Sequence, residues 1–116
     1  MSDAGDSLLV RTTFESDRAV AYVNGEVHLS NSPRLRSDLL SLIDGGARHL
    51  IVDLSQVGYM DSSGVGTLVE IRRRLGQAGG TFALTGLQPR VRNLFEITQL
   101  DKFIRIVDTV DEARRP

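Results

Sequence analysis

The chain has 116 residues, of which 41% are hydrophobic and 25% are charged, and its formal net charge is -1. This composition is typical of one folded domain and excludes a fully disordered chain. The small net charge gives no general electrostatic reason to bind nucleic acid. The absence of cysteine excludes disulfides, thiol catalysis and thiolate metal sites. We expect a single domain over residues 1–116, with flexible ends at 1–6 and 114–116.

The start of the chain and its apolar runs bear on where the protein works. Residues 1–6 are polar and acidic and lack the basic, then apolar, layout of a signal peptide. The longest apolar runs, such as residues 19–23, are far too short to span a bilayer. We therefore expect a cytoplasmic protein that does not insert into a membrane.

The first third of the chain predicts two strands. Residues 8–14 and 18–27 form the strand-like segments, and the turn between them at 15–17 is short enough for an antiparallel hairpin. Apolar residues occur on both alternating faces of the second segment. That pattern is typical of a sheet covered at least partly on both sides.

A helix is predicted next, followed by a buried strand. Asn31 or Ser32 can cap the helix, with Pro33 in its first turn, where the missing N–H costs nothing. Leucines recur at helical spacing until the glycines at 45–46 end the run. The continuous apolar run at 49–54 is typical of a central strand of a parallel sheet.

The remaining segments continue the alternation of helices and strands. They are a helix that begins near Ser62 or Ser63, a strand at 81–85, a helix that begins at Pro89, a short strand at 103–107 and a frayed terminal helix within 108–115. The order is β-β-α-β-α-β-α-β-(α). Alternation of this kind implies parallel pairing in the later part of the sheet. The prediction is one α/β domain with a mixed β-sheet and helices packed on it.

No enzyme chemistry is readable in the sequence. The two histidines, His28 and His49, belong to no cluster with metal-ligand spacing. No Gly-x-Ser-x-Gly motif occurs, and the glycine pair at 64–66 lacks both the third glycine of a dinucleotide fingerprint and the lysine of a phosphate loop. We therefore predict no catalytic residue, no cofactor site and no metal site.

Three consecutive N-cap residues, Asp61, Ser62 and Ser63, join the predicted buried strand to the second helix. The simplest interpretation is that they only cap the helix. Two features favour a functional role instead. Three capping residues are more than one helix needs, and Gly64 and Gly66 in the first turns each cost about 1 kcal/mol relative to alanine. Small residues there leave the backbone open to a partner.

A phosphate on Ser62 would suit this place in the chain. It would lie near free backbone N–H groups and the positive end of the helix dipole, so the fold should tolerate it. It would also add about -1.5 to -2 charges to the surface. A partner packed on this loop would meet new bulk and charge without any unfolding of the domain.

The segment at 53–66 resembles the signature of STAS-domain anti-sigma factor antagonists. The likeness extends over nearly the whole chain. The further similar segments are residues 24–27, the glycine-led strand at 79–85 and the helix pattern at 89–100. The resemblance implies a STAS-like domain, in agreement with the α/β order predicted above.

The resemblance also implies a partner-switching role. The unphosphorylated protein would bind an anti-sigma factor with serine kinase activity and so free a sigma factor. That kinase would phosphorylate Ser62, a phosphatase would act on phospho-Ser62, and Ser63 would be only a neighbour. ATP would belong to the kinase, so no cofactor is implied. The alternative is a binding module of the same fold that is not phosphorylated and senses a small ligand or docks in a larger signalling assembly.

The predicted partner-binding residues come from two segments, one after the second strand and one at the start of the second helix. They are Gly25, Glu26, His28, Met60, Asp61, Ser62, Ser63, Gly64 and Gly66. His28 stands where the family usually has Asp, close to the expected partner-binding face. We expect this difference to bear on which kinase is recognised.

Overall fold

The structure, a computed structural model, describes residues 8–116. The elements follow the predicted order, which confirms the single mixed α/β architecture. In chain order they are β1 (Leu9–Glu15), β2 (Arg18–Asn24), α1 (Ser32–Asp44), β3 (His49–Gln56), α2 (Ser62–Gln77), β4 (Thr81–Thr85), α3 (Pro89–Ile97), a 3-10 helix (Leu100–Lys102), β5 (Arg105–Val107) and α4 (Val110–Ala113). The predicted flexibility of residues 1–6 lies outside the described residues.

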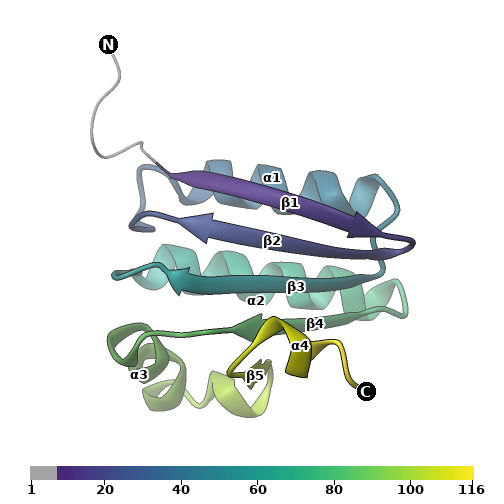
Figure 1. The fold of residues 1–116 in the computed structure, drawn as a ribbon. Coiled ribbons are helices and arrows are strands. Elements are labelled where there is room, and N and C mark those ends of the chain that lie inside the picture. The colour runs from purple at the N-terminus through teal and green to yellow at the C-terminus, as the bar shows by residue number, and fades with distance from the viewer. Residues whose placement is uncertain (1–7) are drawn as a thin grey trace.

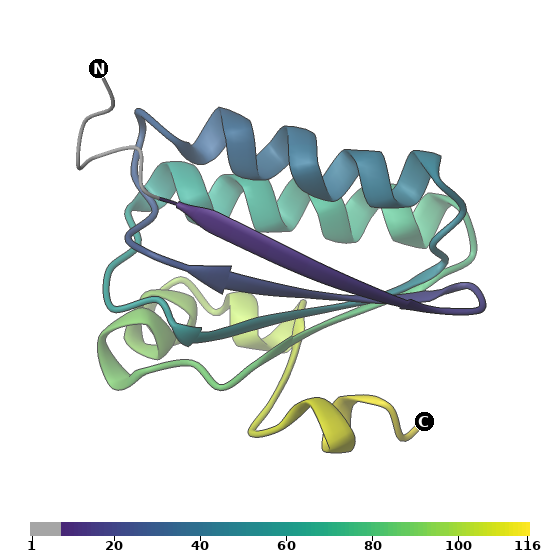
Figure 2. The same ribbon diagram turned by 45° about the horizontal axis from the view of Figure 1, so that its top comes forward.

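The five strands lie in the order β1-β2-β3-β4-β5, so each strand is next to its neighbour in the chain. β1 and β2 are antiparallel, and the other pairs are parallel. Every parallel connection therefore moves one strand in the same direction, and right-handed crossovers then place the connecting helices on one face. Figure 1 shows α1 and α2 behind the sheet, and Figure 2 shows them together above it.

The main core lies between the sheet and this helical layer. The alternation in β2 is as predicted, because Ala21 and Val23 point into the main core while Val20 belongs to a second apolar cluster on the opposite face. The largest fully buried helix residues of the main core recur at helical spacing. They are Leu35, Leu39, Leu68, Ile71, Leu75 and Phe95.

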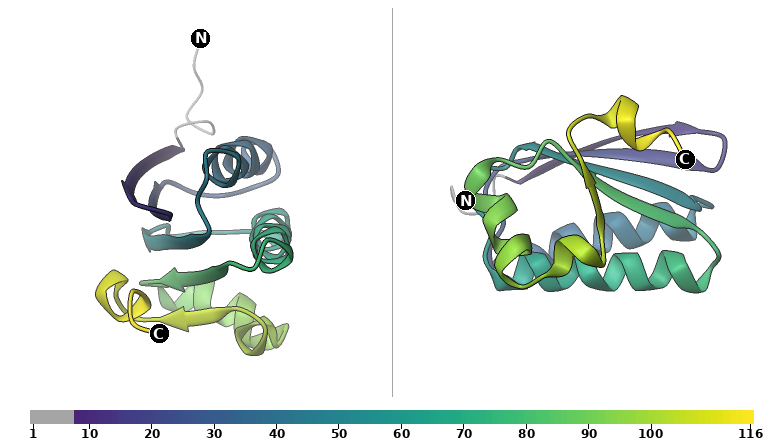
Figure 3. Two further views of the ribbon diagram at one scale, coloured as in Figure 1. Left: turned by 90° about the vertical axis from the view of Figure 1, so that its right-hand side faces the viewer. Right: turned by 90° about the horizontal axis from the view of Figure 1, so that it is seen from below.

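The face of the sheet without crossover helices is covered in part by α4. Figure 3 shows the C-terminal turn on the side of the sheet opposite to α1 and α2. Ala113 packs there against Val20, Ile51 and Ala83, and these four buried residues form the second cluster. The short terminal helix thus shields apolar side chains that the crossover helices cannot reach.

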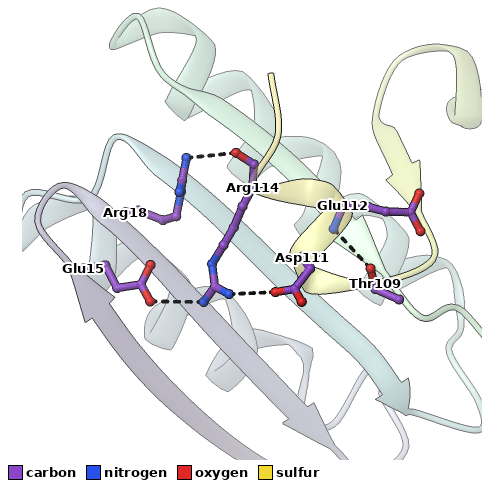
Figure 4. A network of polar contacts seen from close by, with 6 residues as sticks. All are labelled: Glu15, Arg18, Thr109, Asp111, Glu112 and Arg114. Atoms are coloured by element: carbon purple, nitrogen blue, oxygen red, sulfur yellow. Dashed lines mark hydrogen bonds and ion pairs between the residues drawn. The ribbon is translucent and has the colours of Figure 1, made fainter.

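Arginines hold α4 in this position. Arg18 donates to the carbonyl oxygen of Arg114 at 3.5 Å, and Arg105 donates to two further carbonyls of the last turn. The Arg114 side chain forms ion pairs with Glu15 and with Asp111, both at 3.1 Å (Figure 4). Cationic groups at the end of a helix also match its dipole. The sequence predicts a flexible end at residues 114–116. The first of these residues, Arg114, nevertheless has several contacts to the folded domain.

Replacing Ala113 by Asp is expected to destabilise the domain by about 1–3 kcal/mol, because a carboxylate would be placed among the apolar side chains of the second cluster. The exposed neighbour Arg115 provides the control, and Arg115→Asp should change stability by no more than about 0.5 kcal/mol. Urea unfolding of both variants measures the difference. Equal stability of the two variants would contradict the shielding role of α4.

Several element boundaries differ from the sequence-based prediction, and β3 extends to Gln56 instead of ending at residue 54. β2 ends at Asn24, because Gly25 has φ 125° and turns the chain away from the sheet. The last strand begins only at Arg105, after the 3-10 helix at Leu100–Lys102, whereas α4 at Val110–Ala113 lies within the predicted range. Within residues 8–116, no helix is long and apolar enough to cross a membrane, and no three potential ligands are grouped for a metal ion.

Candidate functional site

Two loops meet where the parallel strands end at one edge of the sheet. The loop at 25–31 follows β2, and the loop at 57–61 follows β3 and leads into α2. The N–H of Val27 donates to the carbonyl of Tyr59 at 3.0 Å, and the N–H of Asp61 donates to the carbonyl of Val27 at 3.0 Å. These bonds form an isolated parallel bridge between the loops. The predicted partner-binding residues from the two segments are thereby brought together.

Asp61 is the N-cap of α2 and uses both of its carboxylate oxygens. One oxygen accepts from the Ser63 N–H at 2.9 Å and from the Ser63 hydroxyl, and the other accepts from the N–H of Leu29 at 3.1 Å. The Ser63 hydroxyl is the main cause that lowers the pKa of Asp61. Partial desolvation opposes it, and backbone N–H groups of Ser63, Gly64 and Leu29 add to the lowering. Asp61 is therefore ionised at neutral pH.

The two serines have different surroundings. Ser62 is the first residue of α2 and is exposed, as predicted, and its hydroxyl forms no hydrogen bond with another residue of the described part of the chain. Ser63 is half-buried, and its hydroxyl donates to Asp61. Capping therefore occupies Asp61 and Ser63, while the Ser62 hydroxyl remains available.

The expectation of free backbone N–H groups near Ser62 is met only by the N–H of Ser62 itself, which has no hydrogen-bond partner within residues 8–116, and is wrong for the next three residues. The N–H of Ser63 donates to the Asp61 carboxylate, and those of Gly64 and Val65 donate to the Asp61 carbonyl. Asp61 thus takes three of the donors that a phosphate would otherwise use. A phosphate on Ser62 would instead lie next to an ionised carboxylate, which favours an outward orientation toward solvent or a partner.

The two glycines of the first turns serve different purposes. Gly64 is buried, and a Cβ atom there would lie 2.6 Å from Cγ of Met60 and 2.8 Å from Cγ1 of Val27. The close approach of α2 to the bridge between the loops therefore requires a glycine at this position. Gly66 is exposed, and a Cβ atom there would meet nothing within 4 Å.

The loop at 25–31 is shaped by Asn31. This residue is the N-cap of α1 by position, but its side chain does not form the predicted cap, and Ser32, the other candidate, is already the first residue of the helix. Its Oδ1 accepts from the N–H of His28 at 2.9 Å, and its Nδ2 donates to the carbonyl of Glu26 at 2.9 Å. The amide side chain is thus turned back to hold the preceding loop. His28 is half-buried, with Nδ1 2.7 Å from the hydroxyl of Ser30.

The predicted partner-binding residues differ in their access to solvent. Glu26, Ser62 and Gly66 are exposed, Gly25, His28, Asp61 and Ser63 are half-buried, and Met60 and Gly64 are buried. Met60 is only 2% exposed and packs in the main core. Any influence of the two buried residues on a partner would therefore pass through the position of the loop and the start of α2.

Sequence reasoning missed two exposed apolar residues at this site. Leu29 is 74% exposed, and Tyr59 is 38% exposed. Leu29 lies between His28 and Ser30 in a polar loop. A single apolar residue among polar neighbours was the only feature of the sequence that could have indicated its exposure. No periodicity in the sequence says that its side chain is directed outward.

A family profile described as STAS domain matches residues 10–113, which is nearly all of the folded part. The chain belongs to the STAS domain family. The resemblance noted at residues 53–66 is thus confirmed at the level of the family, and the observed architecture is that of a single STAS domain.

Similar STAS domain proteins are named as anti-sigma factor antagonists. The anti-sigma-B factor antagonist of Staphylococcus aureus is 31% identical over 100 residues, which cover 86% of this chain and 93% of that protein. An anti-sigma factor antagonist from Mycobacterium paratuberculosis has a TM-score of 0.84 at 27% identity, covering 93% of this chain and 92% of the other. SpoIIAA in its unphosphorylated form has a TM-score of 0.77 at 25% identity, covering 92% of each chain. SpoIIAA of Bacillus is also known in a phosphorylated form.

The stabilisation that ionised Asp61 gives the STAS domain is expected to depend on pH. Its pKa is lower in the folded state than the ordinary value of 3.8, so this stabilisation is fully present above that value and is lost as the pH falls through the folded-state pKa. Asp61→Asn retains a capping side chain but cannot titrate. Urea unfolding should show a stability difference between wild type and variant that is constant above about pH 5 and shrinks in more acid solution. A difference that grows toward acid pH would contradict this assignment.

Proposed function

We propose that this STAS domain protein is an anti-sigma factor antagonist. In its unphosphorylated form it binds an anti-sigma factor that has serine kinase activity, and it thereby frees a sigma factor. Phosphorylation of Ser62 ends the interaction, and a phosphatase acting on phospho-Ser62 restores it. The protein acts by binding rather than by catalysis, and the ATP is bound by the kinase.

The observation that carries this proposal is the difference between Ser62 and Ser63. A kinase must draw a serine hydroxyl into its own active site. The Ser62 hydroxyl is exposed and has no hydrogen bond to break within residues 8–116, whereas the Ser63 hydroxyl must leave Asp61. The names of the related proteins and the phosphorylated form of SpoIIAA support the same function.

The electrostatic surroundings of Ser62 explain how a phosphate would act. It would add about -1.5 to -2 charges beside the ionised carboxylate of Asp61. None of the ion pairs within residues 8–116 involves Asp61, so no cation of the domain is paired with this carboxylate. A partner that covers the helix start would have to desolvate this concentrated charge, which weakens binding.

The test is direct phosphorylation by the candidate partners. The protein is incubated with ATP and, in turn, with each anti-sigma factor kinase of the same genome, and the products are analysed by mass spectrometry and size-exclusion chromatography. We expect one kinase to form a complex with the unphosphorylated protein and to attach a single phosphate to Ser62. Absence of both binding and phosphorylation with every such kinase would refute the proposal.

One observation favours a second candidate function, that of a module which senses a small ligand. An open cavity of about 440 Å³ lies on the sheet face without crossover helices. Arg11 stacks over the ring of Tyr22 at 4.5 Å there, and the carboxylate of Asp53 accepts from the buried Thr85 hydroxyl at 2.8 Å. Retention of a small molecule through purification, together with no phosphorylation of Ser62, would favour this second function.

A further inference from the structure

We infer that Asp61 is a positioning residue that fastens the loop at 25–31 to the start of α2, and that it thereby presents Leu29 as a fixed apolar anchor for the protein partner. The partner that fits this surface has an apolar pocket for a leucine side chain beside the place that receives Ser62. The role of Leu29 in binding rests on the proposed function. The role of Asp61 within the domain does not.

The hydrogen bond between Asp61 and Leu29 joins two segments that are 32 residues apart in the chain. Nearer the sheet, the loops are already joined through Val27. Beyond Val27 the loop at 25–31 turns away toward α1, and the Leu29 N–H is held by Asp61 Oδ2 at 3.1 Å. This bond fixes the backbone at the place where the most exposed large hydrophobic side chain of the described chain projects into solvent.

A single exposed leucine is common on protein surfaces and by itself indicates nothing. Leu29 differs because its backbone is held on both sides. His28 before it is held through its N–H by Asn31, and the His28 carbonyl accepts from the N–H groups of Asn31 and Ser32. Asp61 holds Leu29 itself. An apolar side chain on a rigid backbone loses little conformational entropy when a partner covers it, and such preorganisation favours affinity.

Capping alone does not explain why an aspartate stands at this position. Ser, Asn and Asp are similarly good N-caps, and the cap of α2 uses only one oxygen of Asp61. Serine has a single side-chain oxygen, and the second polar atom of asparagine is a donor that cannot accept from another N–H. Aspartate can satisfy the helix N-terminus and the Leu29 N–H at the same time.

Amide hydrogen exchange of the isolated domain tests the fastening. In Asp61→Asn the Leu29 amide is expected to exchange at least about tenfold faster than in wild type, while the amides in the middle of α2 stay protected. Ser63→Ala is the matched control. It removes the hydroxyl that donates to the other Asp61 oxygen, and it should leave the Leu29 amide protected. Unchanged exchange of the Leu29 amide in Asp61→Asn would overturn the inference.

A double-mutant cycle tests the anchor, using the kinase that phosphorylates the wild-type protein and no ATP. The four proteins are wild type, Leu29→Ala, Asp61→Asn and the double variant. We expect Leu29→Ala to weaken binding at least about tenfold, and Asp61→Asn to weaken binding clearly in wild type but little in the Leu29→Ala background. Equal losses in both backgrounds would show that Asp61 acts on the partner independently of Leu29 and would overturn the anchor.

The two arms also separate this inference from the proposed function. If no kinase binds the wild-type protein, the proposed function fails, and the exchange of the Leu29 amide still decides whether Asp61 fastens the loop. If a kinase binds and phosphorylates Ser62 but Leu29→Ala binds as tightly as wild type, the proposed function stands and the anchor is refuted. Thermal unfolding of each variant verifies that it is folded.

Discussion

Ser62→Ala is expected to remain bound to the partner kinase in the presence of ATP, while the wild-type protein is released. The variant should fold normally, with a change in stability within about 0.5 kcal/mol, because Asp61 and Ser63 supply the cap of α2 and Ser62 is exposed. Ser63→Ala should leave phosphorylation at Ser62 largely intact. Ser62→Asp should fold but bind more weakly, since the added carboxylate lies on the contact surface. Its effect should be smaller than that of a phosphate, because it carries only part of the phosphate charge.

The effect required of the phosphate is large. Reversing a partner from 99% bound to 99% free needs about 5.5 kcal/mol of differential binding free energy. A charge at the solvated rim of an interface cannot supply this, whereas a desolvated phosphate beside the ionised Asp61 can. Ser62 is therefore expected to lie inside the area covered by the partner. The next exposed residue of the helix start, Gly66, is expected there as well.

The measurement is one binding series with wild type, Ser62→Ala, Ser62→Asp and Ser63→Ala, each with and without ATP. Mass spectrometry of the same samples maps the phosphate. The assignment of Ser62 as the switch residue is wrong if ATP releases Ser62→Ala as readily as wild type, or if the phosphate maps to Ser63.

Opposite effects on stability are expected from alanine at the two glycines of the first turns of α2. Gly64→Ala should destabilise the domain by about 1–3 kcal/mol, because the added methyl group would overlap Cγ of Met60 and Cγ1 of Val27. Gly66→Ala should stabilise it by about 0.5–1 kcal/mol, because the site is open and alanine is the better helix former. Each variant thus serves as the control for the other.

Urea unfolding of both glycine variants tests this pair, and the kinase-binding assay adds a second measurement. Because Gly64 contacts the bridge between the two loops, its substitution should also weaken partner binding by displacing the start of α2. Stabilisation by both substitutions would mean that Met60 and Val27 move aside easily, and would refute a packing requirement at Gly64.

The order of elements, the layers and the helix starts could be predicted from the sequence because they depend on local patterns. Alternation of apolar residues in β2, the apolar run of β3 and the helical spacing of leucines each report on burial within one segment. The resemblance at residues 53–66 also located the exposed serine. The errors fell where local pattern is weak, as at the end of β2, where Gly25 takes a positive φ, and at the 3-10 helix before β5.

Only the tertiary structure decided how the residues of the site divide their roles. The sequence by itself offered Asp61, Ser62 and Ser63 as equivalent caps and treated Gly64 and Gly66 alike. Their roles differ because of the loop at 25–31, about thirty residues earlier in the chain. The Leu29 N–H of this loop donates to the Asp61 carboxylate, and its Val27 side chain packs against Gly64. Contacts between segments so far apart depend on the pairing of β2 with β3, and no local pattern in either segment encodes them.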